Sequence, residues 1–173
     1  MKKLLIILLF SSLSFGGEDN ITKLLLEITK LSKSISISNG DVTFIRQSKG
    51  IVEDVKNHLL WEDNNHTLEL VDHFTAHQYC RNLKFKGFDD WSMPTKKELL
   101  YLTNVYRIRP SISNMVFKNT KSDKYWTWNT LHLKNNKIII HWLVDFEYGS
   151  TAFGYSSNEK HYIRCVRNMK ATP

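Results

Sequence analysis

The chain has 173 residues, of which 42% are hydrophobic and 12% aromatic, and it contains only three prolines and seven glycines. This composition excludes fibrous and low-complexity proteins, and the length suits one domain with a core of its own. The formal net charge of +7 favours anionic partners such as acidic or sulfated polysaccharide, and a basic surface without a specific partner is the alternative.

The first 17 residues have the layout of a secretory signal peptide. Lys2 and Lys3 form a positive start, residues 4–10 are an uninterrupted apolar run, and residues 11–17 are small or weakly apolar. The run is too short to span a bilayer, which takes about 20 residues. We therefore expect cleavage and export to the periplasm or the cell surface, with a retained anchor as the alternative. Cleavage leaves a net charge of 7 − 2 = +5, and no later segment predicts a membrane span.

Residues 18–41 predict an amphipathic helix followed by a serine-rich linker. The helix is expected over residues 20–33, where apolar residues recur at helical spacing, namely Ile21, Leu24, Leu25, Ile28 and Leu31. Residues 32–40 are rich in serine and end on a turn signal. The apolar stripe can dock on the domain or pair with a second copy, so self-association through residues 20–33 is one expectation.

The domain itself is expected over residues 42–170. Residues 42–46 and 51–55 predict two short strands, and residues 59–61 form a third apolar run. Two helices follow, each opened by a capping box, which is formed by Thr75 with Gln78 and by Thr95 with Glu98. Their predicted buried faces are Ala76, Cys80 and Leu83 in the first helix, and Leu99, Leu102 and Tyr106 in the second.

The rest of the chain is β-rich. Strands are predicted at residues 125–130, 131–133, 138–146, 151–153 and 162–166, with turns at 134–137 and 148–150. In an exported protein the two cysteines, Cys80 and Cys165, predict a disulfide from the first of the capped helices to the last strand, and a free catalytic thiol is the alternative. The sequence thus predicts an α+β domain with a twisted antiparallel sheet, two helices and one disulfide.

Several short motifs also carry a family resemblance through their order. They are Leu60-Trp61-Glu62-Asp63, Ala76, Tyr79-Cys80-Arg81-Asn82-Leu83, Gly87-Phe88-Asp89-Asp90-Trp91-Ser92-Met93-Pro94-Thr95, Glu98-Leu99, Tyr125-Trp126, Trp142, Val144-Asp145-Phe146, Gly149 and Ile163-Arg164-Cys165-Val166-Arg167. Over about residues 42–168 the set resembles the C-terminal domain of the Legionella collagen-like adhesin. The family usually has Arg and Leu at the positions of Ser92 and Met93, and this chain has no collagen-like repeat.

The resemblance implies a fold similar to C-type lectins and to the sulfatase-modifying group. It also suggests adhesion or glycan binding at a cell surface. The motif residues to which it gives a structural role are Trp61, Trp91, Pro94, Glu98, Trp142, Asp145, Phe146, Gly149, Arg164 and Arg167.

Candidate ligand contacts combine aromatic rings with basic groups, which suits acidic sugars. Alternation along residues 125–128 places Trp126 and Trp128 on one face, which is a stacking platform if it is open and part of the core if it is closed. The candidate set is Trp126, Trp128, Asn129, Lys121, Lys124, Arg107 and Arg109. Arg164 and Arg167 are expected to pair with Asp145 or Glu147.

Patterns for metal binding and catalysis are weak. The spacing of His73, His77 and Cys80 suits zinc on one helix face, but a disulfide removes the thiolate. Asp89 and Asp90 favour a turn over a calcium site. No phosphate loop, serine-hydrolase motif or zinc-protease motif is present, so we expect no catalytic residue, no metal and no cofactor. A thiol enzyme is the alternative, and it would use Cys80 or Cys165 with His141 or His161.

The sequence therefore predicts an exported, non-enzymatic binding or adhesion domain. Its expected partner is an anionic glycan or a surface protein, and no nucleic acid is expected. A periplasmic accessory or assembly protein, which acts through protein contact, is the second hypothesis. A thiol-dependent or metal-dependent enzyme is the third.

Overall fold

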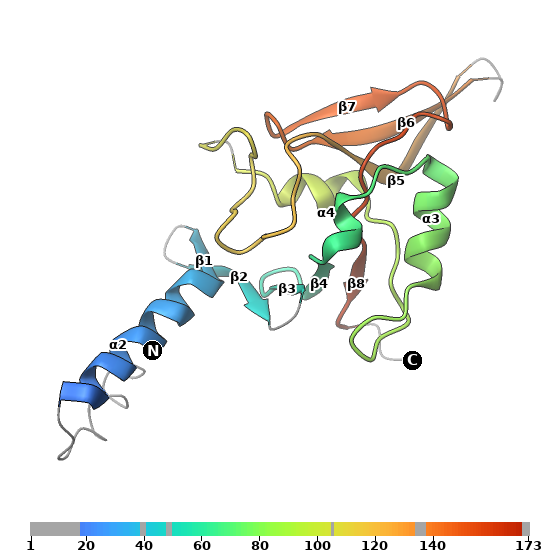
Figure 1. Cartoon of the computed structure of the whole chain (residues 1–173). Coiled ribbons are helices and arrows are strands. Elements are labelled where there is room, and N and C mark those ends of the chain that lie inside the picture. Colours follow the sequence, from blue (N-terminus) through green and yellow to red (C-terminus); the bar gives the residue numbers. More distant parts are fainter. Residues whose placement is uncertain (1–17, 39–40, 48–49, 105, 134–137, 171–173) are drawn as a thin grey trace. The chain divides into compact units, whose positions relative to one another are not determined.

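The structure is a computed structural model that describes residues 18–38, 41–47, 50–104, 106–133 and 138–170 (Figure 1). The chain divides into two compact units, Met1–Lys33 and Ser34–Pro173. The predicted signal peptide over residues 1–17 lies outside the described residues and stays a prediction. None of the helices in the described part of the chain combines the length and the apolar character that crossing a bilayer requires.

Helix α2 spans Glu18–Ser34 and contains the helix predicted over residues 20–33. The expected amphipathic pattern is present in its described side chains. Ile21, Leu25 and Ile28, which share one face, are each roughly half exposed, and so is Leu26 on another side of the helix. The helix therefore carries an apolar stripe that its own unit does not bury.

The larger sheet has five antiparallel strands in the order β1-β2-β3-β4-β8 (Figure 1). Their bounds are Ile35–Ser38 for β1, Asp41–Gln47 for β2, Ile51–Asp54 for β3, Leu59–Glu62 for β4 and Val166–Asn168 for β8. Strand β1 lies where the sequence predicted part of a linker. Its isoleucines and serines alternate with period two, and Ile35 pairs with Ile45 of β2, so the segment has the pattern and the partner of a strand.

Between β4 and β5 the chain forms a short 3-10 helix η1 (Asn65–Leu68) and the helices α3 (His73–Asn82) and α4 (Lys96–Tyr101). The capping box at Thr95 and Glu98 is confirmed. The box predicted at Thr75 and Gln78 is wrong, because Asp72 is the N-cap of α3. Its carboxylate accepts hydrogen bonds from the Thr75 amide at 2.9 Å and the Thr75 hydroxyl at 2.8 Å.

The predicted buried faces of the two helices are largely confirmed. Ala76 and Cys80 of α3 are fully buried, and Leu99 and Leu102 are buried at α4. Leu83 and Tyr106 are the exceptions. Leu83 follows the last residue of α3 and is only partly buried, and Tyr106 lies beyond the end of α4 at Tyr101 with a side chain that is 94% exposed. The apolar period of a helix does not continue past the point where its hydrogen bonding stops.

The second sheet has three antiparallel strands in the order β5-β6-β7, with bounds Lys124–Leu133, Ile138–Asp145 and Ser150–Gly154. The turn predicted at residues 134–137 lies outside the described residues. The turn between β6 and β7 needs Gly149, which has a φ of +74° and whose α-carbon faces Ser111 so closely that a β-carbon would come within 3.2 Å of it.

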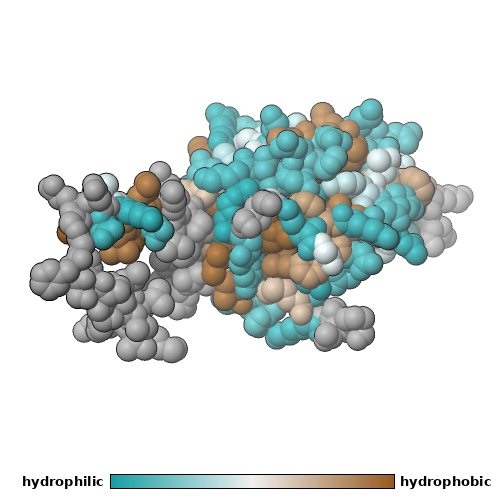
Figure 2. All heavy atoms as spheres, turned by 60° about the horizontal axis from the view of Figure 1, so that its bottom comes forward, coloured by the Kyte–Doolittle hydropathy of each residue, from teal (hydrophilic) through white to brown (hydrophobic). Residues whose placement is uncertain are grey.

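The α+β class and the disulfide are confirmed, with two antiparallel sheets in place of the one predicted. Two hydrophobic clusters fill the domain: one gathers around Trp61, Leu99 and Tyr125, and the other around Trp91, Trp126 and the disulfide. The C-type-lectin likeness stays a prediction. On the face shown in Figure 2, hydrophilic side chains predominate, and hydrophobic ones occupy smaller areas between them.

Candidate functional site

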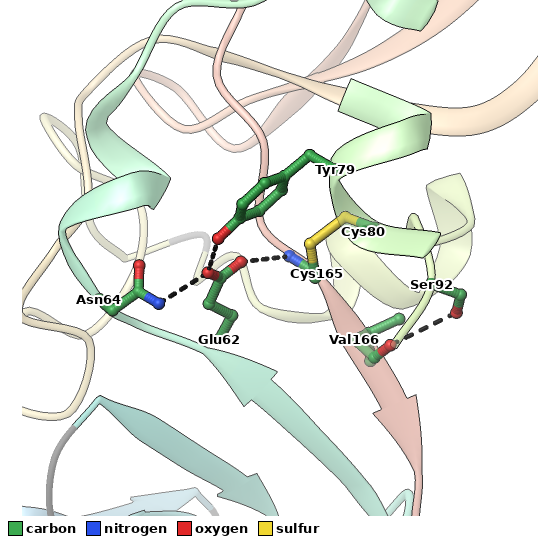
Figure 3. Close-up of a disulfide and its surroundings, with 7 residues drawn as sticks. All are labelled: Glu62, Asn64, Tyr79, Cys80, Ser92, Cys165 and Val166. Atoms are coloured by element: carbon green, nitrogen blue, oxygen red, sulfur yellow. Dashed lines mark hydrogen bonds between the residues drawn. A yellow bond between two sulfur atoms is a disulfide. The ribbon is translucent and has the colours of Figure 1, made fainter. Parts of the chain in front are cut away.

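The disulfide joins α3 to the residue that precedes β8 (Figure 3). Cys80 and Cys165 are fully buried, and their α-carbons lie 5.4 Å apart. The buried Glu62 carboxylate lies beside the bridge, where it accepts hydrogen bonds from the Tyr79 hydroxyl, the Asn64 side-chain amide and the Cys165 backbone amide. These are the only two cysteines of the sequence, so neither sulfur is a thiol in this structure.

Arg164 organises a polar network in the core. Its guanidinium is fully buried and donates to the Asp63 carboxylate at 2.8 Å and to the Glu62 carbonyl at 2.7 Å. It also donates to the Asn119 carbonyl and to the Thr120 hydroxyl. The expected pairing of Arg164 with Asp145 or Glu147 is therefore wrong.

Arg167 has a separate partner. It pairs with Asp90 at 2.5 Å and lies over the Phe88 ring, in place of the expected Asp145 or Glu147. Asp145 instead accepts the Glu147 backbone amide in the turn before β7. The sequence prediction assumed neighbouring strands, whereas β8 and β6 belong to different sheets.

Burial and neighbouring charge act against each other on the two carboxylates of this network. Burial raises the pKa of Glu62. Burial alone would also raise the pKa of Asp63, but the Arg164 charge and hydrogen bonds from Arg164 and Arg46 lower it below its ordinary value. Asp63 is therefore favoured as the charged partner of both guanidinium groups, while burial opposes the ionisation of Glu62.

Four of the five tryptophans do not offer an open ring. Trp61, Trp91 and Trp126 are buried, and Trp142 is half-buried beneath the Lys96 ammonium. Trp126 was a predicted ligand contact, and its burial excludes direct contact in this structure. Its indole nitrogen donates to the Val71 carbonyl at 2.8 Å. Trp126 is therefore a core residue.

Trp128 differs, because its side chain is 53% exposed. The predicted common face of Trp126 and Trp128 is lost where the register of β5 shifts: Trp126 pairs with Leu143 and Thr130 with His141, so three residues oppose one. The Trp128 amide leaves the strand ladder and donates to the Pro94 carbonyl at 2.8 Å. The bulge thus turns one tryptophan outward from a sheet that buries the other.

The Trp128 ring forms one wall of a hollow of about 370 Å³, the Trp128 pocket. The His77 ring lies 4.8 Å from it, centroid to centroid, and Arg81 follows one turn later on the exposed side of α3. The remaining lining comes from the segment that leads into α4, namely Trp91, Ser92, Met93, Thr95 and Glu98. The pocket thus combines an open aromatic ring with a guanidinium, an imidazole, hydroxyl groups and the Glu98 carboxylate, which accepts hydrogen bonds from the Thr95 amide and hydroxyl.

The other predicted ligand contacts lie elsewhere. The Asn129 side-chain oxygen accepts the Lys96 amide at 2.6 Å and so caps the start of α4. Arg109 pairs with Glu147 and Tyr148 near β7. The three further basic residues of the predicted set are Lys121, Lys124 and Arg107. None of the four predicted basic residues lines the Trp128 pocket.

The structure does not support the zinc pattern considered for His73, His77 and Cys80. Cys80 is in the disulfide, and no group of three or more His, Cys, Asp or Glu residues within the described ranges could hold a metal ion. His73 instead lies against His141, with ring centroids 3.9 Å apart. Burial, followed by the charge of His141, lowers the pKa of His73 from 6.5 to about 4. Asp90, which was considered with Asp89 for a calcium site, instead forms an ion pair with Arg167.

The residues that surround Trp128 were not among the ligand contacts predicted from the sequence. His77 and Arg81 are four residues apart, which places them on one helix face, and this spacing was the available signal. Ser92 and Met93, the two positions that depart from the family pattern, line the same pocket.

The fold and the pocket define a class of protein: a disulfide-closed α+β domain with an ion-paired core and an open aromatic pocket. The family model of the Lcl C-terminal domain matches residues 50–167, which is more than half of the chain, and the chain belongs to this family. The family expected from the order of the motifs is thereby confirmed. A search of curated proteins found no match to the chain.

Proposed function

We propose that the chain is an exported, non-enzymatic binding domain whose Trp128 pocket takes an acidic sugar unit of a surface glycan. The observation that carries the proposal is the half-exposed Trp128 ring beside Arg81 at a hollow of about 370 Å³. That volume is in the range of small-molecule sites, which pair apolar walls with a few placed polar groups. An indole face suits the C–H side of a sugar ring, and a guanidinium forms paired hydrogen bonds with a carboxylate or a sulfate.

Two further observations support a binding function over catalysis, and export of the chain over retention inside the cell. Both sulfur atoms are in the disulfide, so thiol chemistry by Cys80 or Cys165 has no nucleophile in this structure. A disulfide in a chain of this size is typical of oxidising compartments, which agrees with the predicted signal peptide. Membership of the Lcl C-terminal domain family fits an adhesion role.

Retention on immobilised heparin tests the proposal with matched variants. Arg81→Gln and Lys160→Gln each remove one positive charge from an exposed residue, but Arg81 lines the pocket and Lys160 does not. We expect Arg81→Gln to elute at clearly lower salt than Lys160→Gln, because a bidentate contact is worth more than a diffuse charge. Equal elution of the two variants would count against the proposal.

A second pair of variants tests the ring. Trp128→Ala removes the exposed indole without changing charge, and Tyr155→Ala removes another exposed aromatic ring that does not line the pocket. Calorimetric titration with a heparin-derived tetrasaccharide should show weaker binding by Trp128→Ala only. Unaltered affinity of a folded Trp128→Ala variant would contradict the assigned site.

A further inference from the structure

A second and larger hollow lies beside the buried ion pairs. It has a volume of about 530 Å³ and shares no lining residue with the Trp128 pocket. Its walls come from the end of β2, the segment after β4, η1, and the segment after α3. We call it the Arg46 pocket after its lining, which includes Arg46, Asp63, Asn64, His66, Lys84 and Asn119.

The Arg46 guanidinium is fixed in place at this hollow. Its Nη1 donates both to the Asp63 carboxylate and to the Val116 carbonyl, the latter at 2.8 Å. Within the described parts of the chain both of its hydrogen bonds use Nη1, which leaves Nη2 and Nε for a ligand. Because the side chain is already held, a ligand binds it with little further loss of rotamer freedom.

The charges around the pocket do not balance. Arg46 and Arg164 both pair with Asp63, so two guanidinium groups share one carboxylate. Glu62 does not line the hollow, where Arg46 and Lys84 face the single carboxylate of Asp63. Lys84 adds an exposed ammonium at the rim, and Asp63 is the one acidic residue among the described residues that line the hollow.

The floor of the pocket is polar and kept open by a glycine. The Asn64 and Asn119 side chains are held by hydrogen bonds to Glu62 and to the Asp63 carbonyl. Gly50 has a φ of +90°, and a β-carbon there would lie 3.3 Å from both the Asn64 β-carbon and the Asp63 carbonyl. A residue with a side chain would crowd this floor, so the space itself depends on the local backbone.

We infer that the Arg46 pocket is a second binding site, which takes the sulfate or carboxylate group of a small polar ligand through Arg46 and Lys84. A preformed guanidinium with free donors, an unbalanced positive charge and a hollow wide enough for a sugar unit are the three observations that support it. The site goes beyond the Trp128 pocket and does not depend on it.

The test is a titration of the protein with N-acetylglucosamine 6-sulfate, followed by the backbone amide signals of Asn64 and Asn65. We expect saturable shifts with the sulfated sugar and none with unsulfated N-acetylglucosamine. Lys84→Gln should weaken binding by about threefold to tenfold, the effect of losing one exposed charged hydrogen bond. Lys84 is exposed, so this variant keeps the fold, whereas Arg46→Gln removes a partner of the buried Asp63 carboxylate and is expected to destabilise the domain.

Arg81→Gln separates this site from the Trp128 pocket. Because Arg81 does not line the Arg46 pocket, the variant should leave the Asn64 and Asn65 titration unchanged. The inference is overturned if the sulfated and unsulfated sugars behave alike, or if Lys84→Gln binds as tightly as the wild-type protein. If Arg81→Gln is no longer retained on heparin but still shows the Asn64 and Asn65 shifts with the sulfated sugar, both sites are supported.

Discussion

Asp63 is the residue on which the polar contacts of the core converge. Its carboxylate accepts hydrogen bonds from Arg46, from Arg164 and from the amides of Lys118 and Asn119. The loop after β4, the segment at residues 118–119 and the chain before β8 therefore all depend on one charged group. Removal of one partner of a buried pair leaves the other charge without compensation.

Asp63→Asn should accordingly lower the free energy of unfolding by about 3–5 kcal/mol. Asp90→Asn is the matched control, because the Arg167–Asp90 pair has a largely exposed carboxylate and is worth at most ~1 kcal/mol. Urea denaturation of the two variants measures both values. Similar small losses in the two variants would show that the buried network does not hold the domain together.

His73 makes the stability depend on pH. Its pKa falls from 6.5 in the unfolded chain to about 4 in the folded protein, through burial and the neighbouring His141, with a smaller effect of His77 and an opposing one of Asp72. Between these values the unfolded chain binds more protons, so stability is fully present above pH 6.5 and is lost as the pH falls toward 4.

His73→Gln should therefore show a shallower loss of stability between pH 6.5 and 4.5 than the wild-type protein. Urea midpoints of the two proteins at several pH values measure the difference in slope. The carboxylates titrate in both proteins, so their effect on stability cancels in the comparison. Parallel pH profiles would show that the His73 imidazole is not held neutral by its surroundings.

At the scale of the elements, several short local signals predicted the structure correctly. The Thr95 capping box, the strands between residues 41 and 154, and the burial of Ala76 and Cys80 in α3 follow from neighbouring residues alone. The last strand, predicted at residues 162–166, is wrong, because residues 163–165 are irregular and β8 spans Val166–Asn168. The prediction that Trp126 and Trp128 share one face was wrong because of a bulge. The bulge depends on how β5 pairs with β6, which no local pattern specifies. The pairing of β1 with β2 and the cap by Asn129 depend in the same way on distant partners.

Asn129→Ala tests the cap that joins β5 to α4. Loss of the bond to the Lys96 amide should destabilise the domain by about 1 kcal/mol, the usual net contribution of one hydrogen bond, because the Thr95 N-cap remains in place. Asn158→Ala is the control, because that side chain is exposed. Equal free energies of unfolding of the two variants in urea would show that Asn129 does not stabilise the start of α4. Asn129 would then remain a candidate ligand contact.

Self-association through α2 stays a prediction. The residues Ile21, Leu24 and Ile28 follow the spacing of a paired helix seam, and Leu26 lies away from it. Leu24→Asn with Ile28→Asn should lower the weight-average mass in sedimentation experiments at high concentration, and Leu26→Asn should not. A monomeric wild-type protein at every concentration would rule the pairing out.

At the scale of the whole molecule, the family motifs turn out to hold the scaffold together. In the terminal motif, Arg164 binds Asp63, Cys165 forms the disulfide, Val166 packs in the core and Arg167 binds Asp90. Motif order could therefore predict the family, while the order of the elements predicted the α+β class and the cysteine pair predicted the disulfide. It could not predict the Trp128 pocket, because His77, Arg81 and Trp128 meet only through the bulge and the packing of α3.

An open tryptophan on this scaffold is proposed to contact an acidic glycan. Trp128 is the only one of the five tryptophans, all within the described ranges, with an exposed side chain. Indole NMR signals recorded during titration with a heparin-derived tetrasaccharide test it most directly. The Trp128 signal, assigned through Trp128→Phe, should move while those of Trp61 and Trp126 stay in place. A Trp128 signal that remains fixed as the ligand saturates the protein would contradict the claim.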